Sequence, residues 1–316
     1  MTQYILKRIL ATIPVLIIVS IVSFALIRIV PGDVLDVMYA DSSLTTEEIQ
    51  ELRVKLGYDK PMYIQYLDWM KGVLTLDAGD SLWTRRPVLQ EIADRLPITL
   101  ELALLAFIIK MLIGVPIGVL SATQQDKPFD QIARLISIFF LAAPGFWIAT
   151  IVIVFFAGTF GWIPPIGGVA PLFKDPGTNM QQFLIPSLIL GASAAATIIR
   201  LSRSTLLEVI RQDYVRTAFA KGLTARRVWW VHAVKNAMIP VVTAAGTQLG
   251  ALMGGTDITE NIFSLPGVGQ LTLSAINHRD IPQLQINILF LATIYIVLNL
   301  VVDISYGWFD PRIRYR

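Results

Sequence analysis

The sequence predicts an all-α polytopic membrane protein with six transmembrane helices. Hydrophobic residues make up 54% of the 316 residues and charged residues only 16%, whereas a soluble domain carries about a quarter charged residues. Six apolar runs are each close to the roughly 20 residues that cross a bilayer as a helix. Basic side chains concentrate in alternate segments between these runs, which is typical of a chain that crosses a membrane repeatedly.

The first apolar run follows Lys7 and Arg8 and could be mistaken for a secretory signal peptide. It is too long for one, and Val30-Pro31-Gly32-Asp33 follows it in place of a small-residue cleavage site. We therefore expect a retained helix. The six spans are expected at about 9–30, 99–122, 132–160, 183–199, 238–258 and 285–306.

The polar segment between the first two spans predicts an extracytoplasmic helical cap. Thr45 and Glu48 have the spacing of a helix-capping box. An amphipathic helix is expected after Pro61, and a third short helix from Pro87 to the start of the second span. Twelve acidic residues here outnumber seven basic ones. A solvated cap with no specific role is the alternative interpretation.

The distribution of charge predicts the topology. Residues 1–8, the 123–135 and 200–235 segments and the C-terminal tail together hold fifteen Lys and Arg but five Asp and Glu. The segments between them, on the other side of the predicted membrane, hold nine basic and fifteen acidic residues. Because short cytoplasmic segments carry an excess of Lys and Arg, both termini are expected in the cytoplasm.

Residues 213–240, which we call the elbow, predict a short helix, a break at Gly222 and a second helix. Glycine supplies the left-handed conformation that closes a helix, and Thr224 is placed to cap the next one. The elbow is cationic, and it carries Trp229 and Trp230 where a bilayer interface favours aromatic rings. This pattern predicts a docking surface, and an ordinary cytoplasmic loop is the alternative.

Several residues in or near the spans are candidates for a gate or a transport pathway. Proline removes a backbone hydrogen bond and can kink a helix, and a charge at membrane depth is costly enough to suggest a function. A proline- and glycine-rich turn there is tolerated only where it is buried or lines a cavity. The candidates are Pro116, Pro144, Asp257, Glu260, Phe263, Pro266 and Gly267.

The sequence contains no pattern that predicts an enzyme. It lacks the glycine-rich phosphate-binding loop of ATPases and any catalytic constellation. Its two histidines, His232 and His278, fall on opposite sides of the predicted membrane, and it has no cysteine, so no metal site is expected. No basic run interleaved with aromatic residues lies away from the spans, so a nucleic-acid partner is not expected either.

Four separated motifs carry a resemblance to a known family over essentially the whole chain. They are Tyr214-Val-Arg-Thr-Ala-Phe-Ala-Lys-Gly222, His232-x-x-x-Asn236-Ala237-x-x-Pro240, Glu260-x-x-Phe263-x-x-Pro266-Gly267-x-Gly269 and Asp310-Pro-Arg-Ile-Arg-Tyr315. The Val30–Asp33 stretch and Arg85-Arg86-Pro87-Val88 match as well. The chain resembles the permease subunits of binding-protein-dependent ABC importers, in the dipeptide and oligopeptide branch.

The resemblance implies a type I ABC importer permease fold in a prokaryotic inner membrane. Residues 1–98 would form the first helix and the cap, and residues 99–316 a five-helix core with a coupling helix near 206–235. The implied partners are a second homologous permease, two ATPase subunits, an extracytoplasmic solute-binding protein and membrane lipid. ATP and magnesium would be bound by the ATPase subunits, so this chain needs no cofactor.

The resemblance also assigns a role to the elbow, whose first helix would sit in a groove of the ATPase. The wider superfamily has an acidic residue at the place of Arg216 and a proline at that of Lys235, and both departures fit the peptide branch. A small residue such as Ala218 would allow close approach to the ATPase. The implied docking residues are Asp213, Tyr214, Arg216, Thr217, Ala218, Ala220, Lys221, Gly222 and Leu223.

The implied function is half of a translocation pathway for peptides that a binding protein delivers. Relatives also import nickel, glutathione or oligosaccharides, so the cargo stays open. A stand-alone channel is a further alternative. A structural subunit of a respiratory-type complex is disfavoured, because the chain lacks paired membrane histidines.

Overall fold

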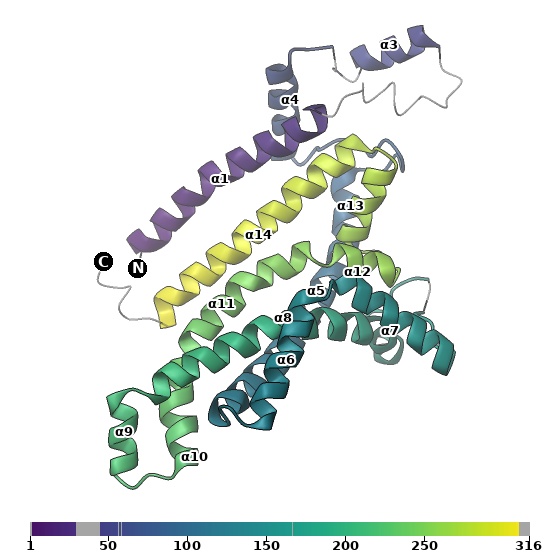
Figure 1. Cartoon of the computed structure of the whole chain (residues 1–316). Coiled ribbons are helices and arrows are strands. Elements are labelled where there is room, and N and C mark those ends of the chain that lie inside the picture. Colours follow the sequence, from purple (N-terminus) through teal and green to yellow (C-terminus); the bar gives the residue numbers. More distant parts are fainter. Residues whose placement is uncertain (1, 30–44, 56, 58, 166, 310–316) are drawn as a thin grey trace.

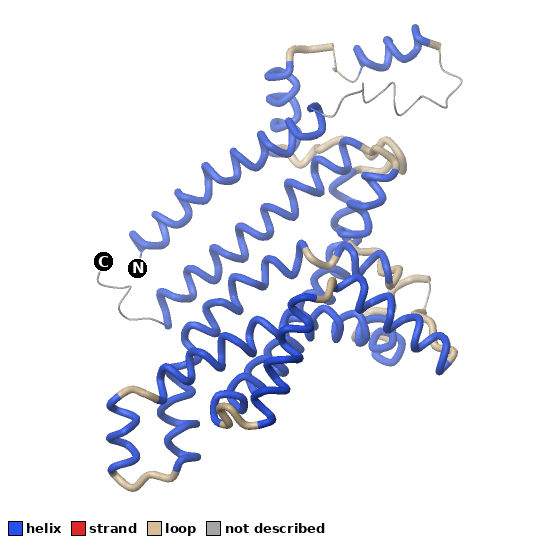
Figure 2. The backbone as a smooth tube through the Cα atoms, in the orientation of Figure 1, coloured by secondary structure: helices blue, strands red, loops and turns tan. Residues whose placement is uncertain are grey.

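The computed structural model describes the chain except for residues 1, 30–44, 56, 58, 166 and 310–316 (Figure 1). Every regular element in the described part is a helix, as Figure 2 shows, and one isolated β-bridge joins Asp80 and Pro87. The all-α prediction is confirmed. The Val30–Asp33 and Asp310–Tyr315 motifs lie outside the described residues.

Among the described residues, five helices are long and apolar enough to cross a membrane. They are α1 (Thr2–Ile29), α5 (Val88–Thr123), α8 (Pro176–Ile210), α11 (Val234–Gly254) with the π-helical turn η1 (Val228–Ala233), and α14 (Ile281–Phe309). The short helices are α3 (Thr46–Lys55), α4 (Met62–Leu74), α9 (Asp213–Ala220), α10 (Ala225–Arg227), α12 (Asp257–Ile262) and α13 (Val268–Asn277).

The third predicted span is two helices rather than one. Helices α6 (Pro128–Ala142) and α7 (Gly145–Phe160) meet at an angle of 102°, and the described part has six spans only if this pair is counted as one. Proline has no backbone N–H, and it forces the preceding residue out of the helical conformation. Ala143 accordingly has φ −78° and ψ 128°, so Pro144 ends α6 instead of kinking a continuous helix.

The short helix predicted after Pro87 does not exist as a separate element. Helix α5 runs for 36 residues from Val88 through Pro97 and Pro116 to Thr123, so the boundary expected at residues 98/99 falls inside it. Buried Val88 and Ile92 pack against Leu271 of α13 and Ile286 of α14. These contacts hold the first turns of α5 in the helical conformation.

The cap joins the bundle through α4. Tyr66 and Trp69 of α4 contact the ring of Phe24 in α1, with ring centroids 5.4 and 5.7 Å away. The hydroxyls of Tyr66 and Ser20 are hydrogen-bonded at 2.8 Å. The predicted capping box of α3 is confirmed, since the Thr45 N–H donates to Glu48 Oε2 at 2.7 Å and the Glu48 N–H donates to Thr45 Oγ1 at 3.3 Å.

The centre of the molecule is the α5–α8 pair, whose backbones approach closely at glycines. A Cβ atom added to Gly114 would lie 2.7 Å from Ile198 Cβ, and one added to Gly118 would lie 2.6 Å from Ser202 Cβ. Gly191 of α8 fits in the same way against the Ala106 carbonyl of α5. Small residues allow this approach in membrane helices, and the result is a tightly packed unit around which the other helices gather.

Candidate functional sites

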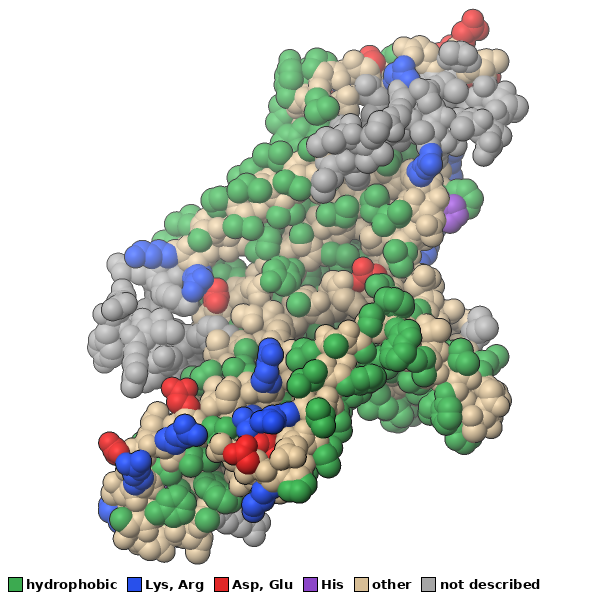
Figure 3. All heavy atoms as spheres, viewed as in Figure 1, with side chains coloured by type: hydrophobic (Ala, Val, Ile, Leu, Met, Phe, Trp, Pro, Cys, Tyr) green, Lys and Arg blue, Asp and Glu red, His purple; other side chains and the backbone are tan. Residues whose placement is uncertain are grey.

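The elbow lies at one end of the bundle. Helices α9 and α10 stand side by side beyond the end of α8 (Figure 1). On the face drawn in Figure 3, Lys and Arg side chains gather toward this end, while hydrophobic side chains cover the middle of the long helices. The elbow is therefore a cationic projection beyond the apolar belt.

Helix α9 has one face turned inward and one turned outward. Val215 and Ala218 are buried and form a small cluster with Val228 of η1, against which Leu223 packs. In this structure the small side chain of Ala218 approaches Val228, and its close approach to a partner stays a prediction. The outward side carries Asp213, Tyr214, Arg216, Thr217, Phe219 and Ala220, and the exposed Lys221 follows it.

The turn after α9 depends on the backbone freedom of Gly222. Its φ is +79°, in the left-handed region, and nothing lies within 4 Å of a Cβ added there. Glycine is needed here for conformation rather than for space. Thr224 occupies the predicted cap position, but its side chain makes no capping hydrogen bond. The predicted break is thus confirmed and the predicted cap bond is wrong.

The spacing of the first two motifs is explained by one set of hydrogen bonds. Asn236 Nδ2 donates to the Tyr214 hydroxyl at 2.8 Å, and that hydroxyl donates to the His232 carbonyl at 3.4 Å. Asn236 Nδ2 also donates to the His232 carbonyl at 3.3 Å. These bonds fasten the start of α9 to the helix that continues into α11, so the outward face of α9 has a fixed orientation relative to a membrane span.

The second site is the turn between α12 and α13, at the opposite end of α11. Glu260 is fully buried, and its carboxylate accepts hydrogen bonds from Thr99 Oγ1 at 2.7 Å and from the Gln270 N–H at 3.0 Å. Thr99 Oγ1 in turn accepts the Val268 N–H at 2.8 Å. Together these groups satisfy N–H groups in the first turn of α13 that have no partner within the helix.

Burial raises the pKa of the Glu260 carboxyl, and the hydrogen bonds from Thr99 and Gln270 partly oppose that shift. The two glycines of the motif make room for neighbouring acidic residues. A Cβ on Gly267 would overlap the Glu260 carboxylate, and one on Gly269 would overlap Asp257. The acidic, proline and glycine positions of this motif therefore belong to one capped turn.

The structure brings together five of the seven residues predicted for a gate or pathway. Asp257, Glu260, Phe263, Pro266 and Gly267 lie in or beside the α12–α13 turn, where Phe263 is a buried core residue. The other two, which lie apart, are Pro116 in the interior of α5 and Pro144 at the α6–α7 bend. A role in the pathway stays a prediction for all seven.

Two polar contacts in and just before the first part of α5 were not predicted from the sequence. Thr99 reaches Glu260 across 161 positions of the chain, and Asp280 bonds to Ser81 Oγ and to the Leu82 N–H across 199 and 198 positions. Local sequence carries no signal for such distant pairings.

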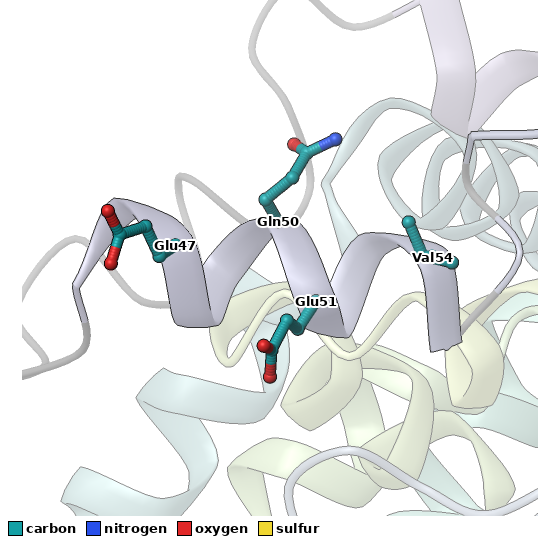
Figure 4. Close-up of a pocket in the computed structure, with 4 residues that line it drawn as sticks. All are labelled: Glu47, Gln50, Glu51 and Val54. Atoms are coloured by element: carbon teal, nitrogen blue, oxygen red, sulfur yellow. The ribbon is translucent and has the colours of Figure 1, made fainter.

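A surface hollow of about 510 Å³ lies on the cap, and its described lining is Glu47, Gln50, Glu51 and Val54 of α3. Figure 4 shows that these side chains point in different directions from one helix. They do not converge on a common point, so they offer no arrangement for holding a ligand.

The fold and the two sites define a polytopic helical membrane protein with a basic projection at one end and a capped polar turn at the other. Residues 114–315 match the family described as binding-protein-dependent transport system inner membrane component, and residues 1–103 match its N-terminal model. The chain belongs to this family. It is therefore a membrane component of such a transport system, and the family itself is not a catalytic one.

Curated relatives of similar length match the whole chain. It is 38% identical over 315 residues to a putative peptide transport system permease protein of Brucella abortus (strain 2308), with 100% of each chain covered. It is 38% identical to the dipeptide transport system permease protein DppB of Alkalihalophilus pseudofirmus and 37% identical to that of Escherichia coli (strain K12), again over 100% of both chains.

One solved structure supports the fold. The crystal structure of an amino acid ABC transporter with histidines aligns with a TM-score of 0.53 at 17% identity, and it covers 71% of this chain and 94% of that chain. The type I permease architecture predicted from the resemblance is confirmed.

Proposed function

We propose that the chain forms half of the translocation pathway of an ATP-driven importer that takes up peptides. Its family is binding-protein-dependent, which supports an extracytoplasmic binding protein as the source of cargo. The relatives named as peptide and dipeptide permeases support a peptide as that cargo. The chain has no phosphate-binding loop, so the energy must come from separate ATPase subunits.

The observation that carries this proposal is the outward face of α9. Arg216 and Phe219 are exposed, with 77% of the Arg216 side chain and 41% of Phe219 accessible. Aromatic and arginine side chains that are presented together are typical anchors of protein interfaces. Because Val215 and the Tyr214–Asn236 bond hold α9 against the helix leading into α11, force applied to this face is passed to a membrane span.

The same proposal sets the orientation in the membrane. The α9 end carries the excess of basic residues and faces the cytoplasm, where ATPase subunits would be. Arg8 of α1 pairs with Asp303 of α14 at 2.9 Å, so the start of the first helix and the end of the last lie on one side of the bundle. Both termini are then cytoplasmic, and the cap and the α12–α13 turn face outward.

The proposal is tested by reversing one charge at the end of α9. Lys221→Glu should abolish copurification of the ATPase subunits with the permease pair, together with cargo-stimulated ATP hydrolysis, because it replaces an exposed base of the docking face by a carboxylate. Lys174→Glu is the matched control, since Lys174 is exposed just before α8, at the opposite end of that helix from α9, and should retain both. A Lys221→Glu complex with normal ATPase content and uptake would refute the assignment of α9.

The cargo needs a separate measurement. Titrating the cognate binding protein with dipeptides, longer peptides, glutathione, nickel and oligosaccharides should give the tightest binding for a peptide. Tightest binding of another compound would identify that compound as the cargo, and the proposed permease role would be unaffected. Uptake by vesicles that contain this chain alone would instead support a stand-alone channel.

A further inference from the structure

Helix α6 is attached to the bundle by a narrow stripe. Only Asp130, Ala133 and Ser137 of its described residues are buried, and their spacing of three and four places them on one helical face. The rest of α6 is largely exposed apolar surface. The exposed large residues are Phe129, Ile132, Leu135, Ile136, Ile138, Phe139 and Leu141. Asp130, in the first turn, is the one charged member of the attached stripe.

The Asp130 carboxylate is enclosed by donors from three parts of the chain. Arg203 of α8 binds it through two parallel hydrogen bonds, from Nε to Oδ1 and from a terminal nitrogen to Oδ2, each 2.7 Å long. Ser121 Oγ of α5 donates to Oδ1, and the Asp126 N–H donates to Oδ2 at 3.0 Å. The Asp130 side chain is fully buried and that of Arg203 is 18% exposed.

Such an arrangement holds its partners in a defined geometry. Two parallel bonds between arginine and a carboxylate fix both distance and orientation. A buried pair of this kind is weak evidence for overall stability, whereas loss of one member leaves an uncompensated charge. The pair therefore links the position of α6 to that of α8 more strictly than the small side chains of Ala133 and Ser137 could.

Arg203 lies on the rigid part of the molecule that leads to the elbow. The adjacent Ser202 is at the close approach with Gly118, so α5 and α8 are in contact one residue away from the pair. Helix α8 continues to Ile210, and α9 starts at Asp213. Leu206 and Val209 of this last stretch are buried against Ala233 and Ala237 of the helix leading into α11.

At its other end α6 leads toward the turn between α12 and α13, which we call the outer turn. After the 102° bend it continues as α7, whose Ala149 is buried in one cluster with Leu102, Phe263 and Leu265. A continuous series of packed elements thus runs from α9 through α8, the Asp130–Arg203 pair, α6 and α7 to the residues beside Glu260.

We propose that Asp130 and Arg203 are positioning residues that make α6 follow the end of α8 when an ATPase moves the elbow, so that ATP turnover is converted into a change at the outer turn. This inference rests on the proposed function, because it requires a driven elbow. Neither residue contacts the outward face of α9. Breaking the pair should therefore uncouple transport from ATP hydrolysis without releasing the ATPase subunits.

The test uses the assembled complex of permease pair, ATPase subunits and binding protein in lipid vesicles. Asp130→Asn and Arg203→Lys should retain the ATPase subunits and ATP hydrolysis, but uptake per ATP should fall by about tenfold, within the usual range of coupling between sites. Arg200→Gln is the matched control, since Arg200 is exposed on the same helix, and it should behave as wild type.

A distance measurement separates positioning from simple support of the fold. The chain has no cysteine, so single spin labels can be introduced by Gln131→Cys on α6 and Arg211→Cys after α8. In the wild-type background the distance between the labels should keep one narrow distribution with and without ATP. In the Asp130→Asn background it should broaden when ATP is added.

Three outcomes would overturn the inference. These are unchanged uptake per ATP in both variants, a distance distribution that stays narrow in Asp130→Asn, and loss of assembly in both variants, which would make the pair a folding element only. A wild-type chain that never copurifies with ATPase subunits would instead refute the proposed function.

Discussion

Replacing Gly267 by alanine should destabilise the turn between α12 and α13 by displacing Glu260. Gly267 has φ −90° and ψ −176°, an extended conformation that any residue adopts, so alanine causes no backbone strain. The added Cβ would overlap the Glu260 carboxylate. The carboxylate must therefore move away from Thr99 Oγ1 and the Gln270 N–H, to which it is now bonded at 2.7 and 3.0 Å.

The size of the effect follows from these contacts. Forcing an extra carbon into a filled site costs about 1–3 kcal/mol, and a hydrogen bond to a charged group contributes about 1.5–3 kcal/mol. Since the carboxylate can shift and keep part of its bonding, we expect Gly267→Ala to lower the free energy of unfolding by about 2–4 kcal/mol. Glu260→Ala should cost a similar amount, because it leaves buried donors unpaired.

The double variant distinguishes this mechanism from general damage. With Glu260 truncated there is no carboxylate for the new methyl group to displace, so adding Gly267→Ala to Glu260→Ala should cost less than about 1 kcal/mol. The non-additivity is then about 2 kcal/mol, within the range for residues in direct contact. Reversible unfolding of the purified chain in mixed detergent micelles, followed by tryptophan fluorescence, measures all three variants.

Gly254→Ala is the matched control, because nothing lies within 4 Å of a Cβ added at the end of α11. Its effect should stay within about 1 kcal/mol of zero, the usual scale of a glycine-to-alanine change in a helix. The account would be refuted if Gly267→Ala were as harmless as Gly254→Ala, or if the costs of Gly267→Ala and Glu260→Ala added fully.

Two further predictions concern buried charges. Lys110 of α5 is fully buried, and its Nζ has no hydrogen-bond partner among the described residues. Lys110→Met should therefore raise the free energy of unfolding by about 1–4 kcal/mol, as replacing buried ions by apolar residues often does. A loss of stability in the same unfolding assay would contradict this. The pKa of Glu260 is raised in the folded chain, so the folded state binds this proton more tightly than the unfolded state does. The resulting contribution to the free energy of unfolding is fully present at low pH and is lost as the pH rises through the raised pKa. The stability of wild type relative to Glu260→Gln should therefore decline as the pH rises, and parallel pH profiles of the two proteins would exclude this.

The sequence predicted most of the elements that depend on local chemistry. Hydropathy located the spans because no other regular structure satisfies a single apolar segment in lipid. Thr45 with Glu48 predicted the start of α3, and Gly222 predicted the left-handed break, since each depends on residues only a few positions apart. The same local reasoning failed at Thr224, whose side chain makes no capping bond, and at the boundary expected at residues 98/99, through which α5 continues.

The candidate sites were predicted only in part. The motif around Glu260 was found from its proline and glycines, but its structure depends on Thr99, 161 positions away. The burial of Ala218 against Val228 across the Gly222 turn was not predicted, because the two residues belong to different helices. The Asp130–Arg203 pair was not predicted at all, although Arg203 was counted among the basic residues of its segment.

By itself, then, the sequence determined that the chain lies in a bilayer, how many apolar runs it has, the sign of the net charge in the connecting segments, and the family. These depend on composition and on residues close together in the chain. Only the tertiary structure decided the 102° bend of α6 against α7, the inward side of α9 and which buried carboxylate meets which donor. Those depend on distant segments packing together, and a buried charge is tolerated only where such packing brings it a partner.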